Sequence, residues 1–363
     1  MASSNTIQSE TAIRADIPLT EARRLFSDLY DMPNIIKMYE LPSYSDRNFY
    51  VCVEPNTEYV LKIMSKIDSN LPYMQAIANL LLLVDSNNLP YKCSKPNISK
   101  NGNTVEMVSL STDANSNGKH CVILLTYLPG KLLKDVYTGN TIDLTLLYQC
   151  GKDLAQFLTI LKDYYDPGLE FRKGYIWDTV NLKMVGKYIP KIKDFIDPKD
   201  LELLEKYYGY FIEKIEPNLD KFHKCTIHSD LNEMNLLVNS DGKLIGIIDF
   251  TDTVYSYRIF ELSNLTAYIM VHCYSEGSDP FQVGRHLIQG FLTKLQLSKS
   301  ELDNLFTALT GRLILSAVMG YYYHSQEPTN DYLLNTPKPA INLLRHISEH
   351  EHSAIEEILF KPL

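Results

Sequence analysis

The chain has 363 residues and is 45% hydrophobic, which is enough apolar material for two packed lobes or two domains. Its 35 Lys and Arg against 44 Asp and Glu leave a net charge of −9, which argues against a nucleic-acid backbone or an anionic membrane as the main partner. No apolar run approaches the ~20 residues that span a bilayer, and the N-terminus lacks the pattern of a secretion signal. Six scattered cysteines form no C-x-x-C pair, so we expect reduced thiols in a cytoplasmic protein.

The first part of the chain predicts a short disordered tail over residues 1–15, followed by an α+β lobe over residues 16–128. Apolar residues alternate in the predicted strands and recur at three- and four-residue steps in the predicted helix. In chain order the expected elements are a hairpin of strands 48–54 and 58–64, a helix over 71–88, and strands 105–110 and 119–128 around a polar turn at 113–118.

The character of the chain changes to helix after Pro129-Gly130, which we take as the boundary of a second lobe over residues 129–363. Residues 143–165 and 200–222 keep apolar side chains at helical spacing, and more helix is expected from residue 260 onward. A break between two lobes also predicts a cleft, where small-molecule sites commonly lie.

The stretch "CTIHSDLNEMNLLVNSDGKLIGIIDF", residues 225–250, interrupts the helices and carries the strongest functional signal. Its two apolar runs flank the turn Asn239-Ser-Asp-Gly, which predicts a hairpin that returns Asp249 close to Asn235. His228, Asp230, Asn235 and Asp249 would then gather at one end of a small sheet. Oxygens of Asp and Asn are hard ligands that suit Mg²⁺ and leave positions for water and phosphate.

Phosphoryl transfer needs such a set, because it requires an oriented acceptor hydroxyl and a metal that neutralises phosphate charge. In protein kinases a catalytic-loop Asp accepts the hydroxyl proton, and an Asn five residues later and a second Asp hold metal. Asp230 and Asn235 have the five-residue step, and I-D-F at 248–250 takes the place of the kinase Asp-Phe-Gly. A lone H-x-D is common, and polar residues near a turn are usually solvated or capping groups, so the interpretation depends on the whole arrangement.

H-x-D-x-x-x-x-N followed by I-D-F resembles the aminoglycoside phosphotransferase and choline kinase family, small-molecule relatives of protein kinases. The resemblance implies a two-lobed, protein-kinase-like α+β fold with a small β-rich N-terminal lobe and a larger, mainly helical C-terminal lobe. It implies Asp230 as the catalytic residue, Asn235 and Asp249 as Mg²⁺ ligands, and Lys62 in "YVLKI" as the lysine that holds nucleotide phosphates.

Two further stretches of the first lobe match positions that contact the nucleotide in this family. The loop "LPSYSDRNF" at 41–49 stands where phosphates are covered; it has no glycine, but it offers polar donors. "LLTYLPG" at 124–130 stands at the hinge, whose backbone bonds the purine edge. The expected nucleotide residues are therefore Ser43, Ser45, Asn48, Thr126, Tyr127 and Leu128. An ordinary polar turn remains the alternative for the loop.

Several segments between residues 40 and 350 resemble one branch of the family, the hydroxylysine kinases, including "IHSDLNEMNLLV" and "IIDFTDTVYSYRIFELS". That branch phosphorylates the side-chain hydroxyl of free 5-hydroxylysine and typically uses GTP. A small-molecule kinase of another specificity, for choline, ethanolamine, homoserine or an aminoglycoside, would keep the same catalytic residues. A non-catalytic nucleotide-binding pseudokinase is the second alternative.

The sequence departs from the family pattern at a few positions. Ser229 and Thr251 stand where the family usually has Gly, and Glu261 stands where it often has Asp. The helix at 71–85 has only Gln75 near the place of the Glu that pairs with the nucleotide lysine, so we expect Gln75 beside Lys62. Candidates for contact with the amino-acid acceptor are Asp252 for an ammonium, Arg312 for a carboxylate, and the aromatic rings of Tyr175 and Trp177. The alternatives are a turn-capping acid for Asp252, a surface salt bridge for Arg312 and a core position for Trp177.

Overall fold

The computed structural model describes residues 15–43, 45–110, 118–136, 142–329 and 331–363, and it divides into two compact units. Unit 1 comprises Met1–Asn88, Lys92–Pro129 and Asp166–Phe171, and unit 2 comprises Leu89–Tyr91, Gly130–Tyr165 and Arg172–Leu363. The expected tail falls on residues 1–14, outside the described part, except for Ala15, which is buried in unit 1. The polar turn expected at 113–118 also lies outside the described residues apart from Gly118.

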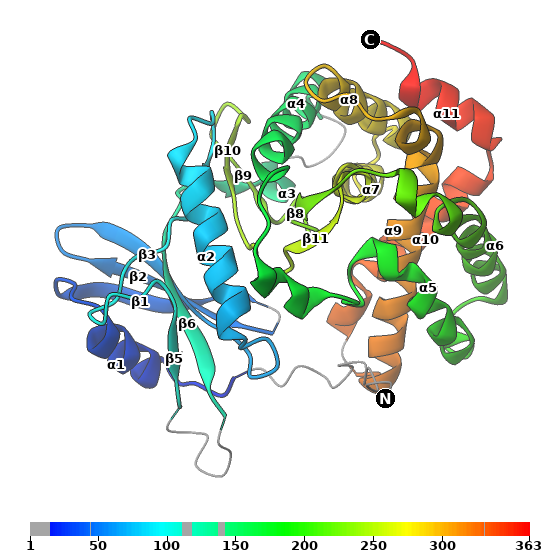
Figure 1. Ribbon diagram of the computed structural model, residues 1–363. Helices are drawn as coiled ribbons and strands as arrows, with labels where there is room; N and C mark the ends of the chain where they lie inside the picture. Colours follow the sequence, from blue (N-terminus) through cyan, green and yellow to red (C-terminus); the bar gives the residue numbers. More distant parts are fainter. Residues whose placement is uncertain (1–14, 44, 111–117, 137–141, 330) are drawn as a thin grey trace. The chain divides into compact units, whose positions relative to one another are not determined.

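Five strands in the described part of unit 1 form an antiparallel sheet, in the order β1-β2-β3-β6-β5 (Figure 1). The strands are β1 (Ile35–Leu41), β2 (Arg47–Val53), β3 (Thr57–Ile63), β5 (Glu106–Val108) and β6 (His120–Thr126), and a short β4 (Lys92–Cys93) belongs to the same unit. The predicted hairpin is confirmed as β2 and β3, whose register places Asn48 opposite Lys62.

Each face of this sheet carries a different set of side chains, because successive residues of a strand point to opposite sides. Helix α1 (Leu19–Leu29) packs on one face through Phe26 and its neighbours, against Phe49, Leu61 and Ile63. Lys62 therefore belongs to the opposite face. Sequence reasoning missed α1, whereas helix α2 (Leu71–Ser86) is confirmed; it begins where the Asn70 side chain accepts the N–H of Tyr73.

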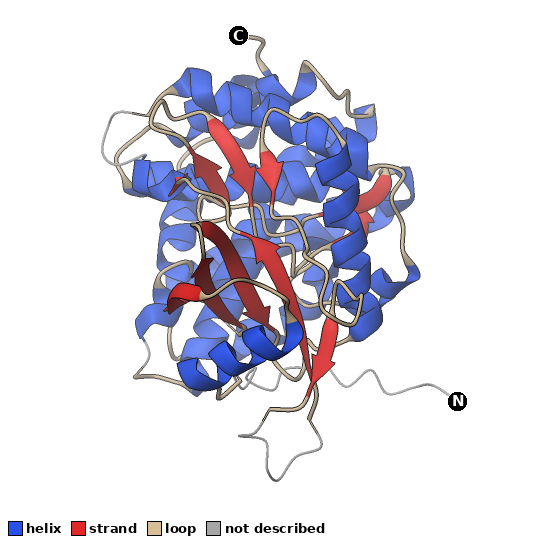
Figure 2. Ribbon diagram, turned by 90° about the vertical axis from the view of Figure 1, so that its left-hand side faces the viewer, coloured by secondary structure: helices blue, strands red, loops and turns tan. Residues whose placement is uncertain are grey.

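Unit 2 is mainly helical. Figure 2 colours the helices of the chain blue and its strands red. Most of the long helices of unit 2 begin at Asp or Ser caps, and Ser298 and Glu301 form a capping box at the start of α9. Its α-helices are α3 (Leu133–Val136), α4 (Leu144–Leu161), α5 (Leu182–Val185), α6 (Pro198–Lys214), α7 (Arg258–Ser275), α8 (Pro280–Leu292), α9 (Lys299–Gln326), α10 (Pro337–Ser348) and α11 (His352–Phe360). Shorter 3₁₀ segments are η3 (Thr179–Asn181), η4 (Gly186–Ile192), η5 (Glu216–Lys221) and η6 (Asp331–Leu334), while η2 (Pro167–Arg172) falls almost wholly in unit 1.

Helix α9 forms the core of unit 2 and packs against α6, α7 and α10 (Figure 1). It is long and apolar enough to cross a membrane by length and composition, but 89% of its most apolar part is buried inside the protein. Core helices of globular proteins share this length and composition. Polar side chains of α9 bond to a side chain of α7, and burial of α9 fixes their positions. They form part of the site described below.

Close packing of helices α4 and α8 depends on two glycines. A Cβ added to Gly151 would lie 2.0 Å from the carbonyl oxygen of Leu287, and one added to Gly290 would lie 1.9 Å from that of Tyr148. Only glycine permits so close an approach of two backbones. All six cysteines of the chain are buried and form no disulfide in the structure.

Two small sheets of unit 2 carry the motif. Strand β8 (Lys224–Ile227) pairs with β11 (Val254–Tyr257), and β9 (Leu236–Val238) lies between β10 (Leu244–Ile247) and β7 (Lys131–Leu132). The hairpin predicted around the turn at 239–242 is therefore confirmed as β9 and β10. It brings the end of β10 back to the end of the loop that follows β8.

Candidate active site

His228 ties the loop after β8 to the segment that follows β10. Its Nε2 lies 3.0 Å from the carbonyl oxygen of Ile248, and its Nδ1 accepts the N–H of Asp230 at 3.3 Å. This arrangement assigns the ring proton to Nε2. Burial lowers the pKa of His228, so the ring is neutral and acts as a structural bridge.

Ser229 has a left-handed backbone, with φ of +70°. Such a conformation costs a residue other than glycine about 1–2 kcal/mol, which explains why glycine is usual here. Its N–H donates to Oε2 of Glu261 at 2.8 Å, and its carbonyl accepts from Nδ2 of Asn264 at 3.0 Å. Burial raises the pKa of Glu261 to about 8. Both of these side chains come from α7, which therefore holds the strained loop in place.

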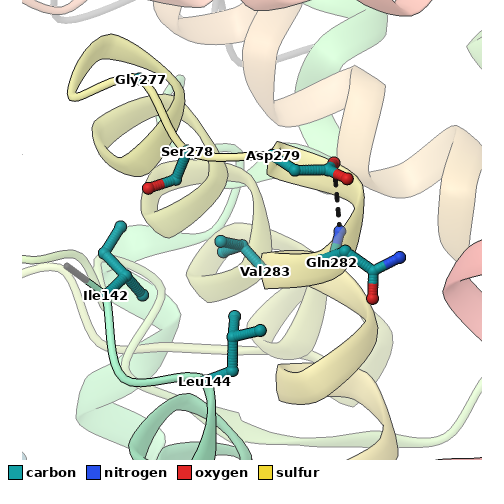
Figure 3. A pocket seen from close by; sticks show the side chains of 7 residues that line it. All are labelled: Ile142, Leu144, Gly277, Ser278, Asp279, Gln282 and Val283. Carbon is teal, nitrogen blue, oxygen red and sulfur yellow. Dashed lines mark hydrogen bonds between the residues drawn. The ribbon is translucent and has the colours of Figure 1, made fainter. Parts of the chain in front are cut away.

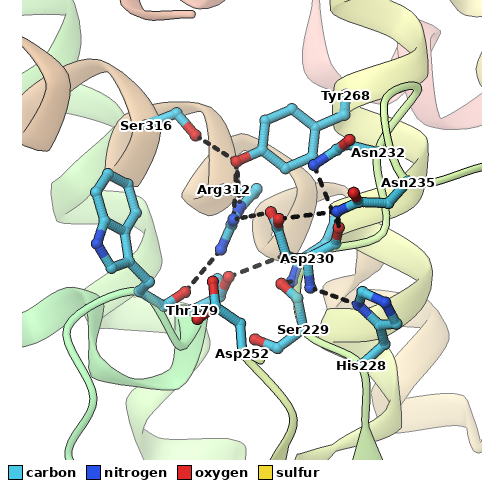
Figure 4. Close-up of polar contacts among 12 residues, drawn as sticks. Thr179, His228, Ser229, Asp230, Asn232, Asn235, Asp252, Tyr268, Arg312 and Ser316 are labelled. Carbon is cyan, nitrogen blue, oxygen red and sulfur yellow. Dashed lines mark hydrogen bonds and ion pairs between the residues drawn. The ribbon is translucent and has the colours of Figure 1, made fainter. Parts of the chain in front are cut away.

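The carboxylate of Asp230 lies between two partners, as Figure 4 shows. Asn235 Nδ2 donates to Oδ2 at 3.0 Å, and Arg312 Nη2 lies 3.4 Å from Oδ1. Burial raises the pKa of Asp230 to about 7, assisted by the charges of Asp252 and Asp249 and opposed by Arg312. Since 29% of its side chain is still exposed, Asp230 can touch a bound molecule.

Arg312 is buried and most of its hydrogen-bonding capacity is already in use (Figure 4). Nε and Nη2 donate to the hydroxyl of Tyr268 at 3.0 and 2.7 Å, and Nη1 donates to the carbonyl oxygen of Trp177 at 2.7 Å. The hydroxyl of Tyr268 also contacts Ser316 Oγ at 3.1 Å. This geometry suits a residue that orients Asp230 better than one that receives an acceptor carboxylate.

Asn235 and Asp249 present oxygens that fit a magnesium ion. The side-chain Nδ2 of Asn235 donates to Asp230, which leaves the side-chain Oδ1 as its acceptor atom. The backbone carbonyl of Asn235 accepts the N–H of Ile248 at 3.0 Å. Asp249 is exposed, has φ of +61°, and accepts the hydroxyl of Thr251 at 2.7 Å. No group of three or more His, Cys, Asp or Glu suited to a metal occurs among the described residues. Two protein oxygens completed by phosphate and water are the usual Mg²⁺ arrangement.

Asp252 lies close enough for its charge to affect Asp230, and it keeps 28% of its side chain exposed. It accepts the hydroxyl of Tyr175 at 2.8 Å, and Arg172 Nη2 lies 3.8 Å away. Arg172 stacks over the ring of Tyr175 and donates to the Thr251 carbonyl at 2.9 Å. Sequence reasoning missed Arg172, because no motif marks an arginine 80 positions before the acid that it approaches.

The aromatic candidate Trp177 packs within unit 2. Its ring stacks on Tyr323 with centroids 6.1 Å apart, and its backbone binds Arg312. Trp177 is therefore linked to Asp230 through Arg312, whereas Tyr175 is bonded to Asp252.

In unit 1, Lys62 forms an ion pair with Asp46, with Nζ 2.7 Å from Oδ2. Asn48 stands opposite Lys62 in the sheet, and its buried Oδ1 has no hydrogen-bond partner among the described residues. Ser43 Oγ donates to the carbonyl of Asp46 at 2.6 Å, and Ser45 lies half-buried in the same loop. The loop and the lysine thus form one polar group on the face opposite α1.

The expectation that Gln75 stands beside Lys62 is wrong. Gln75 Nε2 donates to Thr104 Oγ1 at 2.9 Å and to Asn79 Oδ1 at 3.2 Å. Sequence reasoning missed Asp46 as the acid, because only the strand register shows that the loop reaches this lysine.

Part of the expected hinge backbone is used within unit 1. The N–H of Thr126 donates to the Lys95 carbonyl at 2.9 Å, and the N–H of Tyr127 donates to the Glu58 carbonyl at 3.1 Å. In the described chain no residue accepts the N–H of Leu128. Of the three expected positions, Leu128 is therefore the one whose amide can bond a purine edge.

A separate pocket of about 260 Å³ lies elsewhere in unit 2 (Figure 3). Asp279 in this pocket caps helix α8, accepting the N–H groups of Phe281 and Gln282. The motif residues do not line it, so it is distinct from the phosphotransfer site. Its lining consists of Ile142, Leu144, Gly277, Ser278, Asp279, Gln282 and Val283.

The fold and the site are those of kinase-like phosphotransferases, and comparison with known proteins gives the same class. A model of the phosphotransferase enzyme family matches residues 40–290, and the chain belongs to this family. It is 32% identical to the hydroxylysine kinase of Xenopus laevis over 94% of this chain and 92% of that protein. It is 29% identical to the hydroxylysine kinase of Mus musculus over 98% and 95% of the two chains.

Solved structures show the same fold at low sequence identity. A microcompartment-associated aminopropanol kinase has a TM-score of 0.65 at 14% identity, covering 90% of this chain and 97% of that chain. The GDP and kanamycin complex of APH(2")-IIia has a TM-score of 0.61 at 16% identity, covering 91% and 97%. The predicted two-lobed α+β kinase-like fold is confirmed, and the protein is a small-molecule kinase that phosphorylates an alcohol group.

Proposed function

We propose that the protein transfers the γ-phosphoryl group of GTP, or of ATP, to the side-chain hydroxyl of 5-hydroxylysine. The observation that carries this proposal is the near-full-length similarity to the relatives named hydroxylysine kinase. GTP is the first choice because the resemblance to that branch implies it, and APH(2")-IIia was solved with GDP. ATP stays an alternative, since amicoumacin kinase hAmiN was solved with AMP-PNP.

Asp230 is the residue that accepts the proton of the acceptor hydroxyl. Its pKa of about 7 matches the working pH of an enzyme, which is where a general base is most effective. Asn235 and Arg312 hold its carboxylate from two sides, so that the acceptor oxygen meets an oriented base. Mg²⁺ held by Asn235 and Asp249 would neutralise charge on the donor phosphates.

The nucleotide residues lie in unit 1. Lys62 would bind the α- and β-phosphates, and Asn48 lies opposite it on the same sheet face. Leu128 would bond the purine edge through its backbone.

Asp252 is the proposed partner of the acceptor ammonium. In 5-hydroxylysine the hydroxyl and the side-chain ammonium sit on adjacent carbons, so the ammonium lies within a few ångströms of any group that holds the hydroxyl. Asp252 is half-exposed and close enough to Asp230 for their charges to interact. Lysine has the ammonium but no hydroxyl, so it can bind only as a weak competitor.

The test is a coupled assay for released nucleoside diphosphate with GTP or ATP and a panel of acceptors. We expect 5-hydroxylysine to give the highest kcat/KM, with choline, ethanolamine, homoserine and kanamycin poor. Asp252→Asn should raise the KM for 5-hydroxylysine by about tenfold or more and leave the nucleotide KM unchanged. A higher kcat/KM for another acceptor would refute the substrate, and an unchanged KM in Asp252→Asn would refute the role of that acid.

A further inference from the structure

We infer that Asp46, from the loop between β1 and β2, is the acid that positions Lys62 for the nucleotide. In related kinases the family pattern supplies this acid from the helix that corresponds to α2. This role rests on the proposed function, because it takes Lys62 as the lysine that binds phosphate. The contact between Asp46 and Lys62 couples the phosphate-covering loop to the lysine.

The strand register explains how a loop residue reaches the lysine. Asn48 lies directly opposite Lys62, and Asp46 is the loop residue just before the first residue of β2. The pairing of β2 with β3 therefore holds the end of the loop within reach of the long lysine side chain. The Nζ–Oδ2 distance of 2.7 Å is that of a charge-assisted hydrogen bond.

Burial makes the pair more than a surface contact. The side chains of Lys62 and Asp46 are only 6% and 8% exposed. A buried ammonium without a counter-ion is strongly unfavourable, whereas exposed pairs contribute little. The contact with Asp46 engages one of the three donors of the ammonium and orients the group.

Helix α2 cannot supply the acid. Its one acidic residue is Asp85, near the C-terminal end, and this side chain pairs with Lys95 at 3.0 Å. Gln75 is bonded to Thr104 and Asn79. The Ser43 hydroxyl donates to the Asp46 carbonyl, which ties these two described residues of the loop together.

The experiment measures binding of GDP and of guanosine to Asp46→Asn, Lys62→Met, the double variant and Gln75→Ala by titration calorimetry on the full chain. We expect Asp46→Asn and Lys62→Met each to lower the affinity for GDP by about tenfold or more. The double variant should bind GDP no more weakly than Lys62→Met does. Guanosine has no phosphate, so its affinity should stay within about twofold. If the substitutions acted only by disturbing the fold, the affinity for guanosine would fall as well. Gln75→Ala is the matched control and should bind both ligands normally.

Wild-type affinity for GDP in Asp46→Asn, together with a loss in Lys62→Met, would overturn the role of Asp46 and leave the proposed function intact. Wild-type affinity in Lys62→Met would instead remove the lysine from the nucleotide site, which would overturn the inference and the proposed role of Lys62 but not phosphoryl transfer itself. If Asp46→Asn alone fails to fold, the double variant should fold, because it no longer buries an orphaned ammonium. Failure of the double variant to fold would make Asp46 a structural residue and end the inference.

Discussion

Replacement of Arg312 by Met tests whether this buried arginine controls the charge state of the catalytic acid. Arg312 is 3% exposed, and its Nη2 lies 3.4 Å from Oδ1 of Asp230. Met keeps much of the side-chain volume but removes the charge and the hydrogen bonds to Tyr268 and Trp177. Arg312→Lys is the matched control, since it keeps the charge and loses the planar fork.

The size of the effect follows from the distance. Two opposite charges 3.4 Å apart interact by about 5 kcal/mol at an effective dielectric constant of about 20, and by about 1 kcal/mol in water. Asp230 is 29% exposed, so we expect about 1.4–3 kcal/mol, or one to two pH units. Arg312 stabilises the ionised carboxylate, and its loss must therefore raise the pKa of Asp230 above about 7.

The assay is kcat/KM for 5-hydroxylysine between about pH 5.5 and 9.5 at saturating donor and Mg²⁺, because this ratio reports groups of the enzyme before the acceptor binds. The base must be ionised, so activity should rise with pH through about 7 in the wild type. In Arg312→Met this rise should move upward by one to two units, and in Arg312→Lys by less. A lower plateau with the rise at an unchanged pH would refute electrostatic control of Asp230 by Arg312.

Two further predictions concern the metal site and the buried acid Asp178. Asn235→Ala and Asp249→Ala should each abolish Mg²⁺-dependent turnover without unfolding the protein, because each loses a hard oxygen ligand; a wild-type rate at saturating Mg²⁺ in either variant would remove that residue from the site. Burial raises the pKa of Asp178 from 3.8 to about 6, so the native state binds more protons than the unfolded chain and loses stability as pH rises through this window. Asp178→Asn keeps an oxygen for the Ser256 hydroxyl and should therefore raise the thermal midpoint more at pH 8 than at pH 4, by an amount equivalent to up to ~3 kcal/mol. An equal effect at the two pH values would contradict the charge burial.

The catalytic loop and its hairpin follow from the sequence by itself. His228, Asp230, Asn235 and Asp249 lie within 22 consecutive residues, and a short antiparallel hairpin is the only connection needed to bring them together. Local spacing and turn chemistry are enough for such a unit, because no distant part of the chain has to be placed first. Strands β2, β3 and β6 and helices α2, α4 and α6 likewise follow from apolar periodicity, whereas helix α1 does not.

The partners that tune these residues were decided only by tertiary packing. Arg312 comes from the buried helix α9, 82 residues after Asp230, and Asp46 reaches Lys62 through the pairing of two strands. No periodicity or motif marks either contact, since an arginine in an apolar helix and an acid in a loop have many possible partners along the chain. Burying a charge without a partner is costly, and the partners of these two residues are brought to them only once the sheet register and the helix packing are formed.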